Sequence, residues 1–329
     1  MKYFVVSDIH SHYTPLKEAL DKSMYDINNP EHMLIVCGDI FDRGDETLEV
    51  YKFIKSIPKN RRILIRGNHE QLYLNLLDKY LPDSYDYSNG TVKTFCHIAK
   101  VNPEKMDASY WYKKYKGDHS VNVRIILKNI WETIKEKVSK SRITKWLRSK
   151  DWVNYYELDR FIFVHSFIPT EYDVEFGWRD NFRYKPDWRY AYQFEWDDAM
   201  WGCPYKEFMD GLFTPEIRQG KTLVCGHWHS FGFREYFGGF KYENTNDIDF
   251  SIFYSKYLIA LDTCTALSKK VNVMIIDNGV CYDENMNELV EYDIRELFKQ
   301  KIEFFEKGTI DGYPKIETIT VEKEKNESE

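Results

Sequence analysis

Gly38-Asp39-Ile40-Phe41-Asp42-Arg43-Gly44 is the stretch of sequence that decides the fold. It follows the apolar residues 33–37, so we expect a buried strand that ends where a polar loop begins. A buried carboxylate is costly unless it is paired or bound to a metal, which makes Asp39 a candidate metal ligand. Arg43, four residues further on, is suited to hold an anion that the same metal holds.

The same stretch has a second interpretation, based on a cysteine nucleophile. Cys37 and Arg43 have five residues between them, which is the spacing of cysteine-dependent phosphatases. That chemistry needs bare backbone N–H groups around the phosphate, and the carboxylates of Asp39 and Asp42 would repel it. The residues therefore favour Cys37 as a small buried apolar side chain.

Composition limits the class of protein. A chain of 329 residues with 43% hydrophobic residues can form one large α/β domain with insertions, or two domains. Its net charge of -7 argues against nucleic acid as a partner of the whole chain. We expect no membrane helix, because no apolar run is long enough, and the first residues resemble a strand rather than a signal peptide. The six cysteines are scattered without CxxC pairs, which predicts reduced thiols and a cytoplasmic location.

The hydrophobic pattern predicts alternating strands and helices, and hence a layered α/β fold. In such folds the chemistry collects on the loops that follow the strands. The expected strands cover residues 2–7, 33–37, 62–65, 152–157, 160–164, 221–225, 257–261 and 271–276. The expected helices cover residues 14–25 and 47–57, a segment after Asn68, and a terminal helix at 292–305.

We predict a catalytic domain formed by residues 1–78 and 151–310. Residues 79–150 form a helical insertion, and Lys100 to Lys150 hold 14 Lys/Arg against 5 Asp/Glu, a local charge of about 14 - 5 = +9. This basic segment is either a solvated helix face or a cap that attracts polyanionic substrates. Residues 170–215 form an aromatic-rich insertion, and residues 315–329 a disordered tail.

Five polar motifs each follow an expected apolar strand. Each has an ordinary explanation when taken alone, as a helix cap or a turn. Together they predict oxygen- and nitrogen-rich loops that meet at one edge of one sheet, with enough ligands for two metals of the Mn, Fe or Zn type. The motifs are Asp8-x-His10, Gly38-Asp39, Gly67-Asn68-His69-Glu70, Val164-His165 and Gly226-His227-x-His229.

With these motifs the sequence resembles the calcineurin-like metallophosphoesterase superfamily. Asp42-Arg43-Gly44 and Arg66-Gly67-Asn68-His69-Glu70 resemble the branch that holds phosphoprotein phosphatases and symmetrical diadenosine tetraphosphatases. The resemblance implies a β-sandwich flanked by helices, with a dinuclear metal site at one edge. It also implies two divalent metal ions, with Mn expected and Fe or Zn as alternatives.

The resemblance assigns a role to each motif residue. Asp39 would bridge the two metals, and hydroxide activated by them would attack phosphorus. His69 would protonate the leaving oxygen, Asp42 would orient His69, and Arg43 would bind phosphate oxygens, with Asn68 also facing substrate. The remaining metal ligands would be Asp8, His10 and His229 for metal one, and Asn68, His165 and His227 for metal two.

The sequence departs from the family pattern at one substrate-binding position. Related phosphatases carry a second phosphate-binding arginine, often as Trp-x-Arg, where this chain has Trp201-Gly202-Cys203. Arg179, Arg183 and Arg189 in the neighbouring insertion are candidate replacements. Two smaller departures lie near the first motif, where Ser11 stands in place of the usual glycine and His12 is additional.

Three functions compete on this sequence. The first is a metal-dependent phosphomonoesterase of the serine/threonine protein phosphatase type. The second is a nucleotide pyrophosphatase or phosphodiesterase such as a diadenosine tetraphosphate hydrolase, in which the aromatic insertion would stack a base. The third is an inactive binding module, which the intact ligand set argues against. The expected partner is a phosphorylated substrate, either a phosphoprotein or a nucleotide, and not a membrane.

Overall fold

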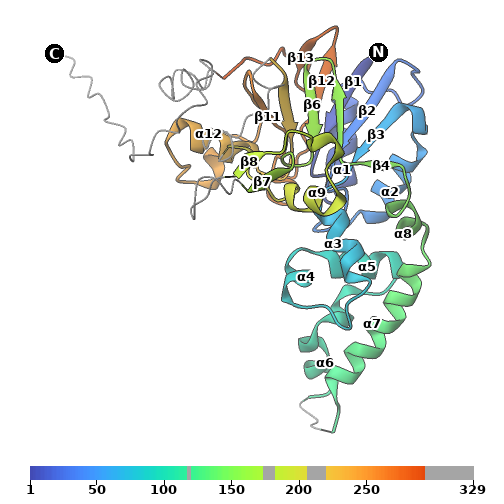
Figure 1. Cartoon of the computed structure of the whole chain (residues 1–329). Helices are drawn as coiled ribbons and strands as arrows, with labels where there is room; N and C mark the ends of the chain where they lie inside the picture. The colour runs from blue at the N-terminus through green and yellow to red at the C-terminus, as the bar shows by residue number, and fades with distance from the viewer. Residues whose placement is uncertain (117–119, 173–181, 206–219, 293–329) are drawn as a thin grey trace, which may run out of the picture.

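Two stacked β-sheets form the centre of the computed structural model, which describes residues 1–116, 120–172, 182–205 and 220–292 (Figure 1). The first sheet has the order β13-β12-β1-β2-β3-β4 and the second the order β10-β11-β9-β6-β5. The strands of the first sheet are β1 (Lys2–Val6), β2 (His32–Cys37), β3 (Arg62–Ile65), β4 (Trp152–Val153), β12 (Met274–Asp277) and β13 (Val280–Tyr282). Those of the second are β5 (Tyr155–Leu158), β6 (Phe161–Val164), β9 (Thr222–Cys225), β10 (Phe253–Tyr254) and β11 (Leu258–Ala260).

Side-chain alternation along the strands explains why the sheets stack. Successive residues of a strand point to opposite faces, so an apolar strand can serve two cores. In β1, Val5 packs into a core between the sheets together with Phe163 and Val224 of the second sheet. Phe4 and Val6 point the other way, into a core that the helices cover. The strands are therefore apolar on both faces, as expected for sheets buried on both sides.

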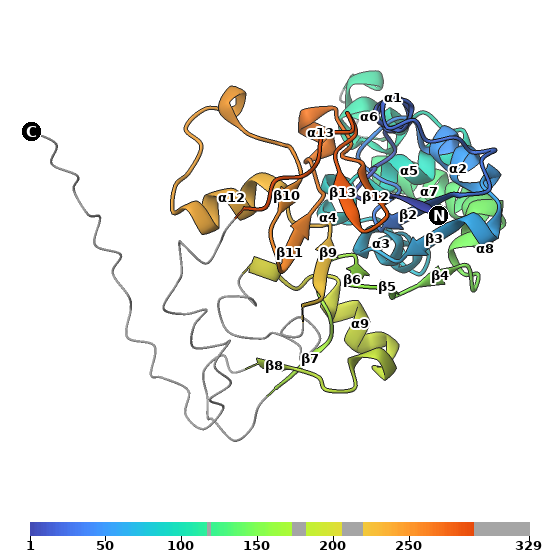
Figure 2. The same ribbon diagram turned by 90° about the horizontal axis from the view of Figure 1, so that it is seen from above.

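Helices cover the outer faces of the sandwich (Figure 2). Those packed on the first sheet come from the N-terminal half, and α9 and α12 pack on the second sheet. This helix–sheet–sheet–helix arrangement confirms the β-sandwich flanked by helices that the resemblance implied. The helices are α1 (Tyr13–Lys22), α2 (Thr47–Ser56), α3 (Asn68–Leu76), α5 (Thr91–Ala99), α9 (Gln193–Ala199), α12 (Ser230–Gly238) and the short α13 (Thr265–Ser268).

The described residues between α3 and β4 form helices joined by turns and loops. The longest of these helices is α7, which buries Val123, Trp131, Ile134 and Val138 on one face. Figure 1 shows α6 and α7 as an arm that points away from the sheets. The further helices of this segment are α4 (Ser84–Ser88), α6 (Ala108–Lys114), α7 (Val123–Ser139) and α8 (Arg142–Leu147).

Two sequence expectations about the sheets are wrong. The five motifs do not lie on one sheet, because three follow strands of the first sheet and two follow strands of the second. The expected strand at 152–157 is two strands, since β4 pairs with β3 and β5 pairs with β6. A change of sheet between two short apolar strands leaves no mark in periodicity, which is why the sequence did not reveal it.

Parallel pairing places the strand ends together despite the split. β1, β2 and β3 are parallel neighbours, and so are β6, β9 and β11.

The short β7 (Thr170–Tyr172) and β8 (Phe182–Tyr184) pair antiparallel within the aromatic-rich segment. The expected helix at 292–305, the tail at 315–329 and parts of 170–215 lie outside the described residues. The predicted domain boundaries stay predictions.

Candidate metal centre

All the side chains predicted as ligands except His229 converge where the strands of both sheets end. The Asn68 Oδ1 atom lies 2.8 Å from His165 Nε2 and 3.0 Å from His227 Nδ1. The two Asp39 carboxylate oxygens point to different neighbours, since Oδ1 lies 3.4 Å from His165 Nε2 and Oδ2 lies 3.7 Å from His10 Nε2. His10 Nε2 is also 3.9 Å from Asp8 Oδ1. The carboxylate of Asp39 thus lies between two donor groups.

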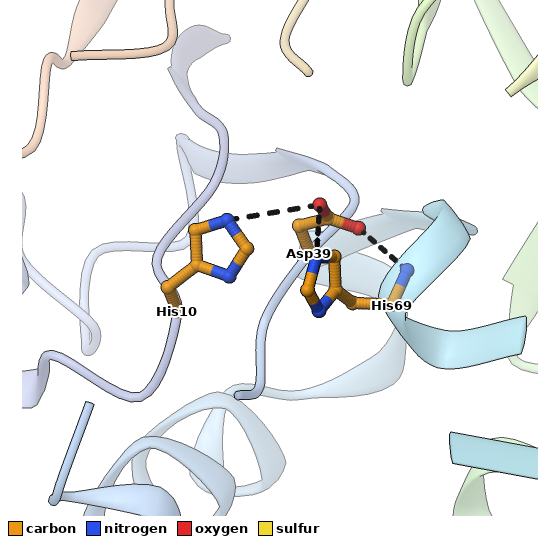
Figure 3. Close-up of side chains that lie close together, drawn as sticks. All are labelled: His10, Asp39 and His69. Carbon is orange, nitrogen blue, oxygen red and sulfur yellow. Dashed lines mark hydrogen bonds and ion pairs between the residues drawn. The ribbon is translucent and has the colours of Figure 1, made fainter. Parts of the chain in front are cut away.

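These two groups each have the composition of a cation site. The donor atoms of His10, Asp39 and His69 lie within 4.8 Å of one another, and so do those of Asp39, His165 and His227. Figure 3 shows the first group, in which the rings of His10 and His69 lie next to each other, with centroids 4.7 Å apart, and both approach the Asp39 carboxylate. Carboxylate, amide and imidazole donors suit Mn, Fe or Zn, so the residues present fit the metals that the sequence predicted.

Burial gives a physical reason for a cation here. Asp8 and Asp39 are each only 1% exposed. Burial raises the pKa of Asp39 to about 7, and burial together with the nearby Asp262 raises the pKa of Asp8. The imidazoles shift the other way, because burial lowers the pKa of His10 and lowers that of His227 to about 2. The imidazoles are therefore neutral and able to bind a cation, and a bound cation would replace the protons that the crowded carboxyl groups otherwise hold.

The loops that carry these donors are tied to each other by Glu70, at the start of α3. Its carboxylate accepts hydrogen bonds from the backbone N–H groups of Asp39 at 2.9 Å, Ile40 at 3.0 Å and Gly67 at 2.9 Å. Asp39 Oδ1 in turn accepts from the backbone N–H of His69 at 3.0 Å, near the positive end of the helix. The Gly67-Asn68-His69-Glu70 motif therefore both supplies donors and positions Asp39.

Two glycines allow the loops to approach closely. A Cβ at Gly226 would lie 2.1 Å from Asp8 Oδ2, and one at Gly67 would lie 2.3 Å from Asp39 Oδ1. Each glycine stands directly beside a carboxylate of the site, where any side chain would push that carboxylate away. The glycines of these two motifs are therefore required by packing at the site.

The backbone at the site is also unusual. Six of the predicted site residues have φ in the left-handed region, which is uncommon for residues with a side chain. Strained conformations persist where the surrounding structure holds them, and they concentrate at functional sites. The six are Asp8 (50°), His10 (48°), Asp39 (54°), Asp42 (75°), Arg43 (60°) and His227 (60°).

His69, which belongs to the first donor group, also forms a cluster with Asp42 and Arg43. His69 Nδ1 lies 2.8 Å from Asp42 Oδ2, and His69 Nε2 lies 3.4 Å from Arg43 Nη2. Burial works against the charged imidazole, but Asp39 and the hydrogen bond to Asp42 outweigh it and raise the pKa of His69 to about 8. Two cationic groups this close favour an anion between or beside them.

His229 does not join either donor group among the described residues. Its Nε2 atom lies 3.6 Å from Asp262 Oδ2, and its side chain is 35% exposed. Asp262 is 2% exposed, and burial raises its pKa to about 7. Sequence reasoning missed Asp262, although it follows the strand β11 closely, the position that marked the five motifs.

The structure shows where the candidate replacements for the missing phosphate-binding arginine lie, and where Cys37 lies. Arg189 does not serve as a free phosphate-binding group, because its Nε and Nη2 atoms each lie 2.8 Å from the Glu157 carboxylate. Arg179 and the side chain of Arg183 lie outside the described part of the structure. Cys37 is fully buried in the core between the sheets, and burial raises its pKa, which excludes it as a thiolate nucleophile.

A family model agrees with this geometry. The model described as calcineurin-like phosphoesterase matches residues 1–231, which include all five motifs. The chain belongs to the calcineurin-like phosphoesterases. The resemblance stated from the motifs is thereby confirmed.

Curated relatives of this phosphoesterase are named as symmetrical bis(5'-nucleosyl)-tetraphosphatases. One from Coxiella burnetii is 29% identical over 225 residues, which cover 68% of this chain and 57% of the relative. One from Haemophilus ducreyi is 27% identical over 175 residues, which cover 53% of this chain and 48% of the relative. The chain thus spans about half the length of these relatives.

Solved structures similar to this phosphoesterase are distant. A cold-active protein-tyrosine phosphatase from a Shewanella species aligns with a TM-score of 0.47 and 15% identity, over 88% of this chain and 79% of its own. A protein serine/threonine phosphatase from Saccharomyces cerevisiae aligns with a TM-score of 0.38 and 13% identity, over 85% of this chain and 73% of its own. Among the described residues, no helix has the length and apolar character needed to cross a bilayer.

Proposed function

We propose that this chain hydrolyses phosphate esters or anhydrides with the help of two divalent cations. One observation carries the proposal: the buried Asp39 carboxylate lies between the donor groups His10–Asp39–His69 and Asp39–His165–His227. Asp8 and His10 would hold one cation with Asp39, and Asn68, His165 and His227 would hold the other. Mn²⁺ is our first expectation, with Fe or Zn as alternatives. Bound there, the cations supply an activated water and neutralise phosphoryl charge.

The side chains around the donors perform the remaining chemistry. Arg43 binds phosphate oxygens through its guanidinium group. As water bonds to phosphorus and the bond to the leaving oxygen breaks, His69 donates the proton on Nε2 to that oxygen. Asp42 accepts the Nδ1 proton of His69 at 2.8 Å, so it holds the ring with Nε2 toward the substrate. The raised pKa of His69, about 8, keeps the proton available near neutrality.

The preferred substrate class is a nucleoside polyphosphate. The relatives named as tetraphosphatases support this choice, although sequence reasoning placed phosphomonoesters first. Trp201 supplies an apolar surface for a base, since it is 42% exposed and its ring lies 5.5 Å from that of His227. Stacking on an aromatic side chain accepts any base, which suits a substrate with two nucleosides. We propose that the segments 79–150 and 170–215 shape this specificity.

A protein phosphatase activity is the second candidate. The His69–Asp42 pair favours it, because a serine or threonine alkoxide is a poor leaving group and gains most from a proton donor. The site offers Arg43 as the phosphate-binding arginine, with Cys203 buried where related enzymes carry another.

A cytoplasmic location agrees with the cysteines. None of the six forms a disulfide in the structure, and five of them are buried. Free thiols persist in a reducing compartment.

A substrate panel tests the proposed function. Protein loaded with Mn²⁺ is assayed on diadenosine tetraphosphate, a phosphothreonine peptide, p-nitrophenyl phosphate and its bis ester. Asp39→Asn is the control, and we expect it to lose cations and activity together. The preferred substrate separates the two candidates. Bound metal without turnover of any substrate would favour a binding module instead.

A further inference from the structure

The helical segment after α3 contacts the loop that carries Asp42 and Arg43. Three residues in the first turn of α5 make these contacts. Thr91 Oγ1 donates to Asp42 Oδ2 at 2.8 Å, and Thr94 Oγ1 accepts from the backbone N–H of Asp42 at 3.1 Å. Lys93 Nζ donates to the carbonyl oxygen of Arg43 at 3.2 Å. The start of α5 thus holds both the side chain and the backbone of this loop.

The contact from Thr91 is made to the atom that also holds His69. Asp42 Oδ2 accepts from His69 Nδ1 and from Thr91 Oγ1, each at 2.8 Å. The other oxygen, Asp42 Oδ1, is buried and has no hydrogen-bond partner among the described residues. Asp42 is 0% exposed and Thr91 is 1% exposed, so water does not compete for these bonds. Within the described structure, the Thr91 hydroxyl is the group besides His69 that fixes the rotation of this carboxylate.

The turn before α5 is shaped for this approach. Gly90 has φ of +83°, a conformation that L side chains rarely adopt. A Cβ at this position would lie 2.5 Å from the backbone nitrogen of Arg43. The helix therefore begins directly against the loop, and its first residue, Thr91, reaches Asp42.

We propose that Thr91 is a positioning residue for the Asp42–His69 pair, and that the helical segment is in this way part of the catalytic machinery. The inference rests on the proposed function, in which His69 donates the proton to the leaving oxygen. Because the Thr91 hydroxyl fixes the carboxylate of Asp42, it also fixes the His69 ring that this carboxylate holds. Residues that hydrogen-bond to metal ligands orient those ligands in the same way. From the sequence, the insertion 79–150 is expected to be a solvated helix face or a cap that attracts polyanions, and no role is expected for Thr91.

The test compares Thr91→Val, which keeps the shape and removes the hydroxyl, with Thr91→Ser, which keeps the hydroxyl. For a phosphothreonine peptide, we expect Thr91→Val to lower kcat roughly 10-fold with little change in KM. This is in the range found when a residue that hydrogen-bonds to a metal ligand is replaced. The loss should be large for a phosphothreonine peptide and small for p-nitrophenyl phosphate, whose leaving group needs no proton. Thr91→Ser should restore kcat.

Thr144→Val is the matched control. Thr144 is also a buried threonine, 1% exposed, whose hydroxyl donates to the Val138 carbonyl oxygen at 2.6 Å and does not contact Asp42. It should lose stability in a thermal melt without the dependence on the leaving group. Equal losses on both substrates for Thr91→Val, or no rescue by Thr91→Ser, would overturn the inference while leaving the proposed function intact.

A second readout does not depend on turnover. In protein loaded with Zn²⁺, which is diamagnetic, the Nδ1 proton of His69 that is held by Asp42 should give a downfield proton NMR signal. We expect this signal to shift or broaden in Thr91→Val and to return in Thr91→Ser. An unchanged signal in Thr91→Val would overturn the inference. Absence of turnover by the wild-type protein would refute the proposed function, and the NMR comparison would still decide the role of Thr91.

Discussion

The two sides of the candidate site differ in how firmly they are held. On the first-sheet side, the loops after β1, β2 and β3 carry Asp8, Asp39 and Asn68, which are 1–2% exposed. On the β9 side, formed by the loop Gly226–His229, the His229 side chain is 35% exposed, and the exposed Trp201 packs against His227. The first-sheet side is buried among protein groups, whereas the β9 side faces solvent.

The hydrogen bonds explain the difference. On the first-sheet side, the single buried carboxylate of Glu70 joins the loops after β2 and β3 through three backbone N–H groups. The β9 side is anchored at Gly226, which donates to the His165 carbonyl oxygen at 2.7 Å, and at the His227 N–H, which donates to Asp8 Oδ2 at 2.9 Å. Beyond these residues the loop opens toward solvent. We infer that the first-sheet side supplies most of the cation ligands, whereas the β9 side, apart from His227, admits substrate.

The largest expected effect lies on the first-sheet side, at His69. His69→Asn should lower kcat roughly 10²–10⁴-fold on an alkyl phosphate, because general acid catalysis contributes about that much. Steady-state kinetics together with metal analysis would measure it. Retained metal with lost activity supports the role of proton donor. Loss of metal would instead make His69 a ligand, as its place in the first donor group allows.

A pair of variants on the β9 side compares an imidazole inside a donor group with one outside both groups. His227 Nδ1 lies 3.0 Å from Asn68 Oδ1, which is expected of two ligands of one cation. His227→Asn should therefore weaken metal binding by at least about 100-fold, which is more than the usual loss when a residue that only hydrogen-bonds to a ligand is replaced. His229→Asn should cost less than about 10-fold, because His229 contacts Asp262 instead. Titration with Zn²⁺ would measure both affinities. Equal losses would make His229 a direct ligand, as the family resemblance implies.

A smaller effect is expected for substrate contacts on the β9 side. Trp201→Ala should raise KM for diadenosine tetraphosphate about 5-fold or more, since stacking of a base on an aromatic ring contributes about 1–3 kcal/mol. KM for a phosphothreonine peptide, which has no base, is the internal control. A similar rise for both substrates would remove Trp201 as a base platform and weaken the nucleotide assignment.

The smallest expected effect is a pH dependence of stabilisation by metal. Because burial raises the pKa of Asp39 to about 7, the folded protein without metal keeps a proton there that the unfolded chain releases near 3.8. The stability from this group is therefore complete below the unfolded pKa and is lost as pH rises through about 7. Metal must displace that proton below pH 7, whereas the imidazoles of His10 and His227, whose pKa values are lowered by desolvation, are already neutral.

Thermal melts with and without Zn²⁺ test this dependence. The rise in Tm on adding metal should be a few degrees larger at pH 7.5 than at pH 5.5. Asp39→Asn is the control for metal binding, because it is expected to lose the cations and should show no rise in Tm at either pH. A rise in Tm that is the same at both pH values would show that Asp39 is ionised before metal binds.

The sequence by itself determined the chemistry of the site. Each of the five motifs follows an apolar strand in the structure, and residue type alone showed that oxygen and nitrogen donors stand at those positions. Strand ends can be read from sequence because an apolar run that stops at glycine and a carboxylate is a local signal. The same rule, applied once more after residues 258–260, would have found Asp262.

Only the tertiary structure decided which residues meet. It distributed the motifs over two sheets, placed His229 against Asp262, and brought Thr91 to Asp42 across 49 residues of sequence. Such contacts depend on sheet pairing and on the close approach that Gly67, Gly90 and Gly226 allow. The physical reason is that local pattern encodes burial and strand ends, whereas contacts between distant segments depend on how the whole chain packs.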